Sequence, residues 1–315
     1  MRNYYIACGL AALLLCAPFA CVRRQTTGIF VDPAFGPLVP PDTKYMAGVR
    51  LDKIRETPLY KRLNGRFGLD SRLDLFSERT GLDPRKDLWQ VLVASNGTGT
   101  LFLARGRFTT GEMEPKLGPL GNTRTRYKDY TLIGTPETSV VFVNPGVAAA
   151  GTQTELRRLI DNRGQWLQIP PPLAEKLKTM PTEDQIWAVS DSSLPLAQLS
   201  GPDTTGMKSM VSNLLGYVKA GVAGIHVDRG VDFKANIECV SEEGSQRVRD
   251  ALKGGIGLAR LNSRDDQQEL LKLYDTVKVN QSGSALNVEA QIAPDLVDPL
   301  LNMVPSLKNA PQRAL

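Results

Sequence analysis

Histidine and cysteine, the side chains behind most metal centres and many nucleophilic active sites, are nearly absent from this sequence. It has 315 residues with one histidine, His226, and four cysteines, three of which (Cys8, Cys16 and Cys21) lie near the N-terminus. One histidine cannot supply the usual ligands of a zinc site, and the remaining cysteine, Cys239, cannot form an intramolecular disulfide. We therefore predict no metal site, and we interpret Cys239 and His226 as structural residues.

Motifs of familiar enzymes are missing as well, including the Gly-x-Ser-x-Gly elbow and Ser-x-x-Lys. The glycine clusters at 96–99 and 253–259 do not join a strand to a helix, as a phosphate loop must, and Gly254 is better interpreted as a helix C-cap. The acidic pairs at 242–243 and 265–266 follow Ser241 and Ser263, an arrangement typical of helix N-termini. We predict no catalytic residue and no cofactor.

Long hydrophobic runs are confined to the N-terminus, where an uncharged stretch follows Arg2 and ends before Arg23. A charged start, an apolar run and small residues before Cys21 are typical of a secretory signal. We predict that residues 1–21 are a signal peptide or membrane anchor. Three alternatives remain open: cleavage after Ala20, lipidation of Cys21, and retention as an anchor. Each places the protein outside the cytoplasm, in the periplasm or on a membrane.

The rest of the chain has the composition of a globular protein, with 42% hydrophobic, 23% charged and only 6% aromatic residues. Its length suits about two domains. Proline-rich stretches mark the predicted boundaries, which are a linker at 22–43, a first lobe at 44–164, a second linker at 165–184, a second lobe at 185–305 and a tail at 306–315.

Hydrophobic periodicity and turn residues predict the same order of elements in both lobes. In the first lobe we expect strands at 44–51, 88–95, 100–108, 124–134 and 139–144, and helices at 52–67, 71–80, 111–117 and 152–162. In the second lobe we expect strands at 185–190, 217–227, 231–240, 276–281 and 285–292, and helices at 194–199, 204–215, 242–253, 265–274 and from Pro294. The spacing between the lobes is roughly 140 residues.

Paired strands separated by short turns indicate antiparallel hairpins, because parallel strands require long crossovers. We predict an α+β protein of two similar lobes, each a mainly antiparallel sheet with helices on one face. A parallel, doubly wound fold would need strands and helices to alternate singly, so we consider it less favoured.

Charge is divided unequally between the lobes. Residues 44–164 carry 20 basic and 13 acidic side chains, a net +7, and residues 165–315 carry 15 and 18, a net −3. The first lobe therefore offers a candidate basic binding surface for an anionic envelope component or membrane surface. The alternative is an ordinary solvated helix face. Nucleic acid is disfavoured as a partner, because export would take the protein away from it. The candidate residues are Arg50, Lys53, Arg55, Lys61, Arg62 and Arg66.

Three stretches resemble a loose family of exported bacterial proteins that has no established activity: 39–60 (VPPDTKYMAGVRLDKIRETPLY), 80–88 (TGLDPRKDL) and 103–108 (LARGRF). The resemblance implies export and a duplicated body, and no functional residues. We favour a non-enzymatic envelope protein with a binding or assembly role. The alternatives are an envelope hydrolase whose carboxylates meet only in the fold, and an architectural membrane-tethered protein.

Overall fold

The computed structural model describes residues 28–67, 69–108, 123–193, 213–263 and 267–302. The predicted targeting segment with Cys21, the helices at 111–117 and 194–199, most of the helix at 204–215 and the tail at 306–315 lie outside these ranges. In the described part of the chain, no helix is both long enough and apolar enough to span a membrane.

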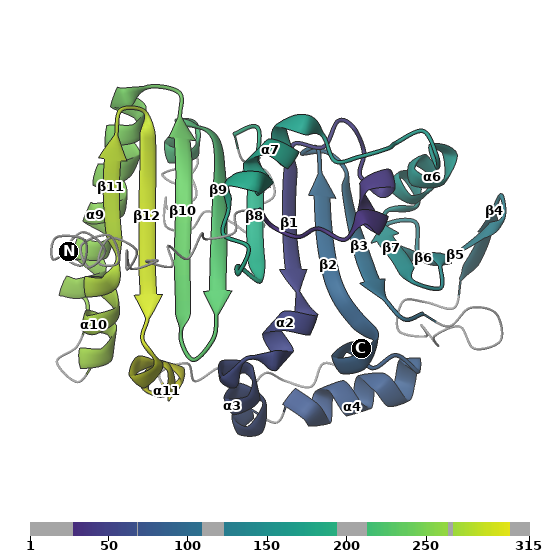
Figure 1. Cartoon of the computed structure of the whole chain (residues 1–315), viewed down its shortest axis with the longest axis horizontal. Coiled ribbons are helices and arrows are strands. Elements are labelled where there is room, and N and C mark those ends of the chain that lie inside the picture. Colours follow the sequence, from purple (N-terminus) through teal and green to yellow (C-terminus); the bar gives the residue numbers. More distant parts are fainter. Residues whose placement is uncertain (1–27, 68, 109–122, 194–212, 264–266, 303–315) are drawn as a thin grey trace, which may run out of the picture.

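All described strands join one antiparallel sheet in the order β11-β12-β10-β9-β8-β1-β2-β3-β7-β6-β5-β4 (Figure 1). The antiparallel α+β fold is thus as predicted, but the two lobes share one sheet instead of having one each. The strands are β1 (Tyr45–Arg50), β2 (Leu88–Ser95), β3 (Thr100–Gly106), β4 (Arg124–Tyr127), β5 (Tyr130–Gly134), β6 (Ser139–Asn144), β7 (Val147–Gly151), β8 (Ile186–Ser190), β9 (Val218–Val227), β10 (Val231–Cys239), β11 (Lys278–Ser282) and β12 (Ala285–Ile292).

Strand order repeats outward from the centre of the sheet, where β1 pairs with β8. On one side follow β2, β3, β7 and β6, and on the other follow β9, β10, β12 and β11. This arrangement matches the repeated order of elements expected from the sequence. The residue boundaries of the lobes and linkers stay a prediction.

Helices cover opposite faces of the sheet in its two halves (Figure 1). In the first half η1, α6 and α7 lie on what we call the front face, and in the second half α9 and α10 lie on the back face. Helices α2 to α5 lie at the lower end of the first half. The bounds are η1 (Pro33–Leu38), α2 (Leu51–Glu56), α3 (Pro58–Phe67), α4 (Leu69–Thr80), α5 (Pro84–Asp87), α6 (Gln153–Asp161), α7 (Pro171–Thr179), α9 (Glu242–Leu261), α10 (Gln268–Thr276) and α11 (Pro294–Asn302).

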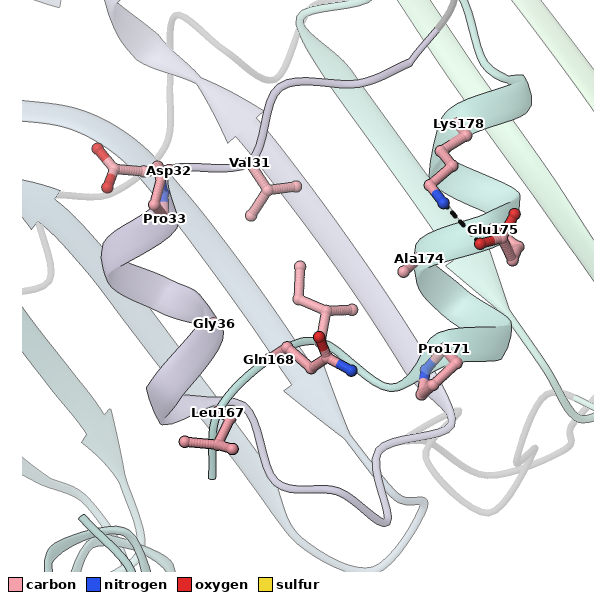
Figure 2. Close-up of a pocket in the computed structure, with 11 residues that line it drawn as sticks. Val31, Asp32, Pro33, Gly36, Leu167, Gln168, Pro171, Ala174, Glu175 and Lys178 are labelled. Carbon is pink, nitrogen blue, oxygen red and sulfur yellow. Dashed lines mark hydrogen bonds and ion pairs between the residues drawn. The ribbon is translucent and has the colours of Figure 1, made fainter. Parts of the chain in front are cut away.

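The two proline-rich stretches are not simple linkers, because each contains a helix packed on the front face (Figure 2). In the 3-10 helix η1, Asp32 caps the N-terminus by accepting a hydrogen bond from the Ala34 N–H. Residues three apart share one side of such a helix, so Phe35 and Leu38 are both buried. The linker predicted at 22–43 thus contains a helix, because fixed proline φ angles also suit a first helical turn.

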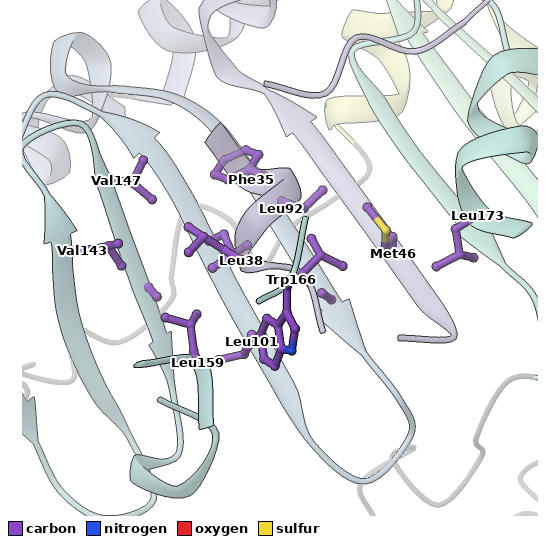
Figure 3. Packing of buried hydrophobic residues seen from close by; sticks show 14 of the residues in the cluster. Phe35, Leu38, Met46, Leu92, Leu101, Val143, Val147, Leu159, Trp166 and Leu173 are labelled. Atoms are coloured by element: carbon purple, nitrogen blue, oxygen red, sulfur yellow. The ribbon is translucent and has the colours of Figure 1, made fainter. Parts of the chain in front are cut away.

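The larger hydrophobic core lies between this front face and η1, α6 and α7 (Figure 3). It contains inward-facing side chains of the central strands, including Met46, Leu92 and Leu103. It also contains Trp166, which belongs to the predicted second linker. A smaller core under α9 and α10 contains Cys239, Val248, Val279 and Leu286.

Local signals were mostly correct at turns and caps. Thr152 caps α6 by accepting from the Glu155 N–H, Ser241 caps α9, and Pro294 begins α11. Two helix-end predictions were wrong. Helix α9 continues past Gly254 to Leu261. Helix α10 follows Gln267, which makes no side-chain capping hydrogen bond, and the Ser263 hydroxyl donates instead to the Ala259 carbonyl.

One predicted strand is a hairpin. Residues 124–134 form β4 and β5, which turn at Lys128–Asp129 with Lys128 at φ 50°. The sequence indicated no break there, since a lysine seldom adopts the left-handed conformation. Strand β7, an alanine-rich stretch, was not expected either.

Candidate functional site

An apolar groove runs across the middle of the back face. Its floor is a row of alanines that face one another in register, with Ala47 on β1, Ala188 on β8, Ala223 on β9 and Ala235 on β10. Paired residues in a sheet point to the same face, and neighbouring strands lie about 4.8 Å apart. Four small side chains in a line therefore form a shallow trough at right angles to the strands.

Larger side chains flank this trough. Val93 pairs with Ala47 at one end, Phe233 stands two residues from Ala235 on β10, and Ile237 and Leu215 complete the other side. The groove has a volume of about 510 Å³, within the range of ligand-binding pockets. None of the described residues that line it carries a charge. The lining consists of Tyr45, Met46, Ala47, Val93, Ser95, Thr100, Ala188, Val189, Ser190, Leu215, Val218, Ala220, Gly221, Val222, Ala223, Phe233, Ala235 and Ile237.

Hydroxyl groups gather along one edge of the groove, in the row beside the alanines. Tyr45 pairs with Ser190 on β8 and with Ser95 on β2, and Ser95 pairs with Thr100. The Tyr45 hydroxyl donates to the Ser193 carbonyl, and the Thr100 hydroxyl donates to Ser95 Oγ over 3.0 Å. The site thus has a polar, uncharged edge and an apolar floor, which suits an amphiphilic molecule.

The groove floor is accessible. Ala188 at its centre is exposed and Ala47, Ala223 and Ala235 are half-buried. Further along the same row Phe102, which pairs with Val93, is 48% exposed. Contiguous exposed apolar surface on a folded protein usually marks a binding site.

A second pocket, of about 430 Å³, lies on the front face between η1 and α7 (Figure 2). Its lining is mixed, with Val31 and Leu167 beside an ion pair between Lys178 Nζ and Glu175 Oε1 at 2.6 Å. The Asp32 carboxylate at its rim already accepts hydrogen bonds from the Ala34 N–H and from Arg105 Nε. These charged groups of the pocket therefore already have ion-pair or hydrogen-bond partners within the protein.

Most of the predicted basic surface is engaged in structural contacts. Arg50 lies over the Phe30 ring, and Lys53 pairs with Glu56. The Arg55 guanidinium donates to the Pro84 carbonyl, and Arg62 donates to the Arg229 carbonyl and pairs with Asp298 of α11. Lys61 is exposed, and the Arg66 side chain lies outside the described residues. A binding role for this set stays a prediction.

The titratable groups singled out in the sequence lie apart from the groove. Cys239 is buried in the smaller core, which raises the pKa of its thiol. His226 is half-buried on β9, with Nδ1 3.1 Å from the Glu183 carbonyl oxygen. Within the described ranges, no three His, Cys, Asp or Glu side chains are placed to hold a metal ion.

Asp184 has the most perturbed carboxyl group. Burial, and then the charge of Glu183, raise its pKa from 3.8 to about 6. Its side chain lies against Gly224, where an added Cβ would be 1.9 Å from Asp184 Oδ2. Gly224 alternates with Ala223 along β9, so Asp184 is on the front face and the groove is on the back face. This carboxyl group cannot serve the groove.

Sequence reasoning missed the groove. The one available signal was the run of small residues in β9, where Gly221 and Ala223 lie on one face of the strand. That pattern becomes a trough only when β1 and β8 bring their own alanines into register.

Comparisons with known proteins give a likeness of fold. No family model matches the chain, and no curated protein matches it. Crystal forms I, III and IV of TP0453, a Treponema protein, are similar to it over 86–87% of this chain and 97–99% of that chain, at 11–12% identity and TM-scores of 0.42 to 0.45. Nothing about function is taken from this likeness.

Proposed function

We propose that this chain is a non-enzymatic, envelope-associated binding protein whose back-face groove holds the acyl chain of a lipid-like amphiphile. The observation behind the proposal is the accessible row Ala47, Ala188, Ala223 and Ala235 with a lining free of charge. Removing an acyl chain from water into such a site is favourable by about 0.8 kcal/mol for each buried CH₂ group.

The hydroxyl edge sets the orientation of the ligand. Tyr45, Ser190 and Thr100 offer hydroxyl oxygens and no formal charge, so an uncharged headgroup fits beside them with its acyl chain along the alanines. The ligand class is therefore a single-chain amphiphile with a hydroxyl-bearing, uncharged headgroup.

An envelope hydrolase, the alternative expected from the sequence, receives less support from this geometry. An acid–base mechanism needs a carboxylate or imidazole within hydrogen-bond reach of the substrate, and the described residues that line the groove include neither. The raised pKa of Asp184 belongs to a group on the other side of the sheet.

The test is fluorescence titration of the full chain with the uncharged apolar probe N-phenyl-1-naphthylamine, followed by displacement with monopalmitin. We expect saturable binding and competitive displacement. Ala188→Trp places a large ring at the centre of the floor, and because Ala188 is exposed the fold should tolerate it. We expect this variant to bind about tenfold or more weakly, a change of roughly 1.4 kcal/mol.

Asn287→Trp is the matched control, since Asn287 is exposed on β12 and faces the front of the sheet. It adds the same aromatic group and should leave binding unchanged. Equal affinities for wild type and Ala188→Trp, or failure of monopalmitin to displace the probe, would refute the groove as the binding site.

A further inference from the structure

A second surface lies at the far end of the first half, where two arginines rest on tyrosine rings. The guanidinium of Arg157 on α6 is 5.0 Å from the centroid of the Tyr127 ring, and that of Arg163 is 5.4 Å from the Tyr130 ring. Tyr127 and Tyr130 are a cross-strand pair of the β4–β5 hairpin, so their Cβ atoms are about 5 Å apart. The two guanidinium groups therefore lie over neighbouring rings on one face of the hairpin.

Neither arginine has a carboxylate partner among the described residues. Asp161 interacts electrostatically with Arg157, but it pairs with Lys128 and accepts hydrogen bonds from the Tyr127 hydroxyl. These bonds hold the pKa of Asp161 below its usual range. Arg157 and Arg163 are both exposed, so their N–H groups face water and are free to bind a phosphate bidentately.

An exposed leucine follows directly along the chain. Leu167 is 78% exposed, while the preceding Trp166 is buried in the core and lies under Arg158. The tryptophan anchors this loop and leaves Leu167 exposed four residues after Arg163. Apolar side chains flanked by arginines and tyrosines are typical of surfaces that enter the headgroup region of a bilayer.

This surface lies on the same side of the molecule as the N-terminal end of the described chain. Leu167 and Lys178 both line the second pocket (Figure 2), and the Gly28 N–H donates to the Met180 carbonyl just beyond α7. Fully extended, the chain from Cys21 to Gly28 spans at most about 25 Å. A membrane-anchored N-terminus, one of the sequence alternatives, would therefore keep this side close to the bilayer.

We propose that Arg157, Arg163 and Leu167 form a docking surface for an anionic lipid bilayer, with the arginines on lipid phosphates and the leucine inserted at the headgroup boundary. A bilayer explains both halves of the surface, whereas a soluble anion or an acidic protein segment would explain only the arginines. This inference is independent of the proposed function, because it concerns other residues on the other face of the sheet.

The test is co-sedimentation of the full chain with vesicles of phosphatidylcholine alone and of phosphatidylcholine mixed with phosphatidylglycerol. The apolar N-terminal segment can enter both, so the measured quantity is the ratio of the two affinities. We expect the wild type to prefer anionic vesicles and to lose the preference at high salt. Arg157→Gln/Arg163→Gln should lower the ratio about tenfold, and Leu167→Ser should weaken binding to anionic vesicles about fivefold.

Arg247→Gln is the matched control. Arg247 also lies on a tyrosine ring, at 5.6 Å from Tyr217, but its Nη2 donates to Glu243 on α9 in the other half. Its loss should leave the ratio unchanged. The proposal would be overturned if the double variant kept the wild-type ratio. It would also be overturned if the double variant lost binding to anionic vesicles while Leu167→Ser bound them as tightly as the wild type. Tighter, arginine-dependent binding to soluble polyglutamate than to vesicles would overturn it as well, and would indicate an acidic protein partner instead.

Discussion

The two halves of the sheet bury opposite faces. Among the described residues, the core under η1, α6 and α7 on the front face has 23 buried members, and the core under α9 and α10 on the back face has 4. The first half is apolar on its back face too, where Val93 and Phe102 are paired, whereas the front of the second half carries polar residues such as Asn236 and Asn287. The helices that cover the sheet change from the front face to the back face at β1 and β8, and the groove lies at this junction.

Small residues make this change possible. In one row on the front face, Trp187 on β8 pairs with Gly48 on β1 and with Gly224 on β9. A Cβ at Gly48 would lie 2.3 Å from Trp187 Cζ2, so only glycine lets the indole lie flat there. The corresponding back row is all alanine. The junction between the halves is therefore filled on the front by one large ring and left as a trough on the back.

The largest effects on stability are expected from substitutions in the two cores. Leu103 and Leu286 are both fully buried, one in each core. We expect Leu103→Ala to lower the free energy of unfolding by about 3–5 kcal/mol and Leu286→Ala by about 2–3 kcal/mol, since a smaller cluster collapses more easily around a cavity. Urea unfolding followed by circular dichroism measures both.

Tryptophan fluorescence sharpens the same experiment, because Trp166 and Trp187 belong to the larger core. One shared sheet predicts that fluorescence and circular dichroism report the same transition in both variants. Separate transitions would mean that the halves unfold independently.

Asp184 gives a pH-dependent test at the junction. Its pKa of about 6 in the folded protein lies above the 3.8 of an unperturbed carboxyl, so its ionisation opposes folding above pH 6, and this cost disappears below about pH 4. Asp184→Asn should raise the free energy of unfolding by roughly 1–3 kcal/mol at neutral pH, with the gain fading between pH 6 and 4.

Asp42 supplies the control with the opposite sign. Burial tends to raise the pKa of its carboxyl, but hydrogen bonds from Arg158 and Asn96 outweigh burial and lower it. Its contribution to stability is present above pH 4 and lost on acidification, so Asp42→Asn should be destabilising at neutral pH. If both variants respond alike to pH, the burial of Asp184 is not the cause.

The smallest effect is expected in α9, the helix that covers the second half. Gly254 is exposed within this helix and an added Cβ would contact nothing within 4 Å. Gly254→Ala should raise the free energy of unfolding by about 0.5–1 kcal/mol, because it removes backbone entropy from the unfolded chain.

Gly283 is the contrasting glycine, in the β11–β12 turn. It is equally uncrowded but has φ +55°, a left-handed conformation. Gly283→Ala should therefore destabilise the protein by about 1 kcal/mol. Thermal unfolding of the two variants measures this difference, and a loss of stability in Gly254→Ala would mean that the α9 glycines serve another purpose.

Local chemistry in the sequence determined much of this protein. The hydrogen bond that Thr152 accepts, the turns at 96–99 and 228–230 and the alternation in β9 and β10 depend on near neighbours, so they and the antiparallel α+β class were predictable. Near neighbours also gave two wrong indications. The prolines at 33–41 suggested a linker without a helix, but Phe35 is buried in η1, and Gly254 suggested a helix end, but α9 continues to Leu261.

Only the tertiary structure decided how the halves join and what surfaces result. Ala47 and Ala188 are far apart in the chain, and nothing near either one specifies the other as its partner. The same holds for Arg157 on Tyr127 and for Asp184 on Gly224. Sequence periodicity sets which side of a strand is apolar, but register between distant strands sets whether those sides build a core, a trough or a docking surface.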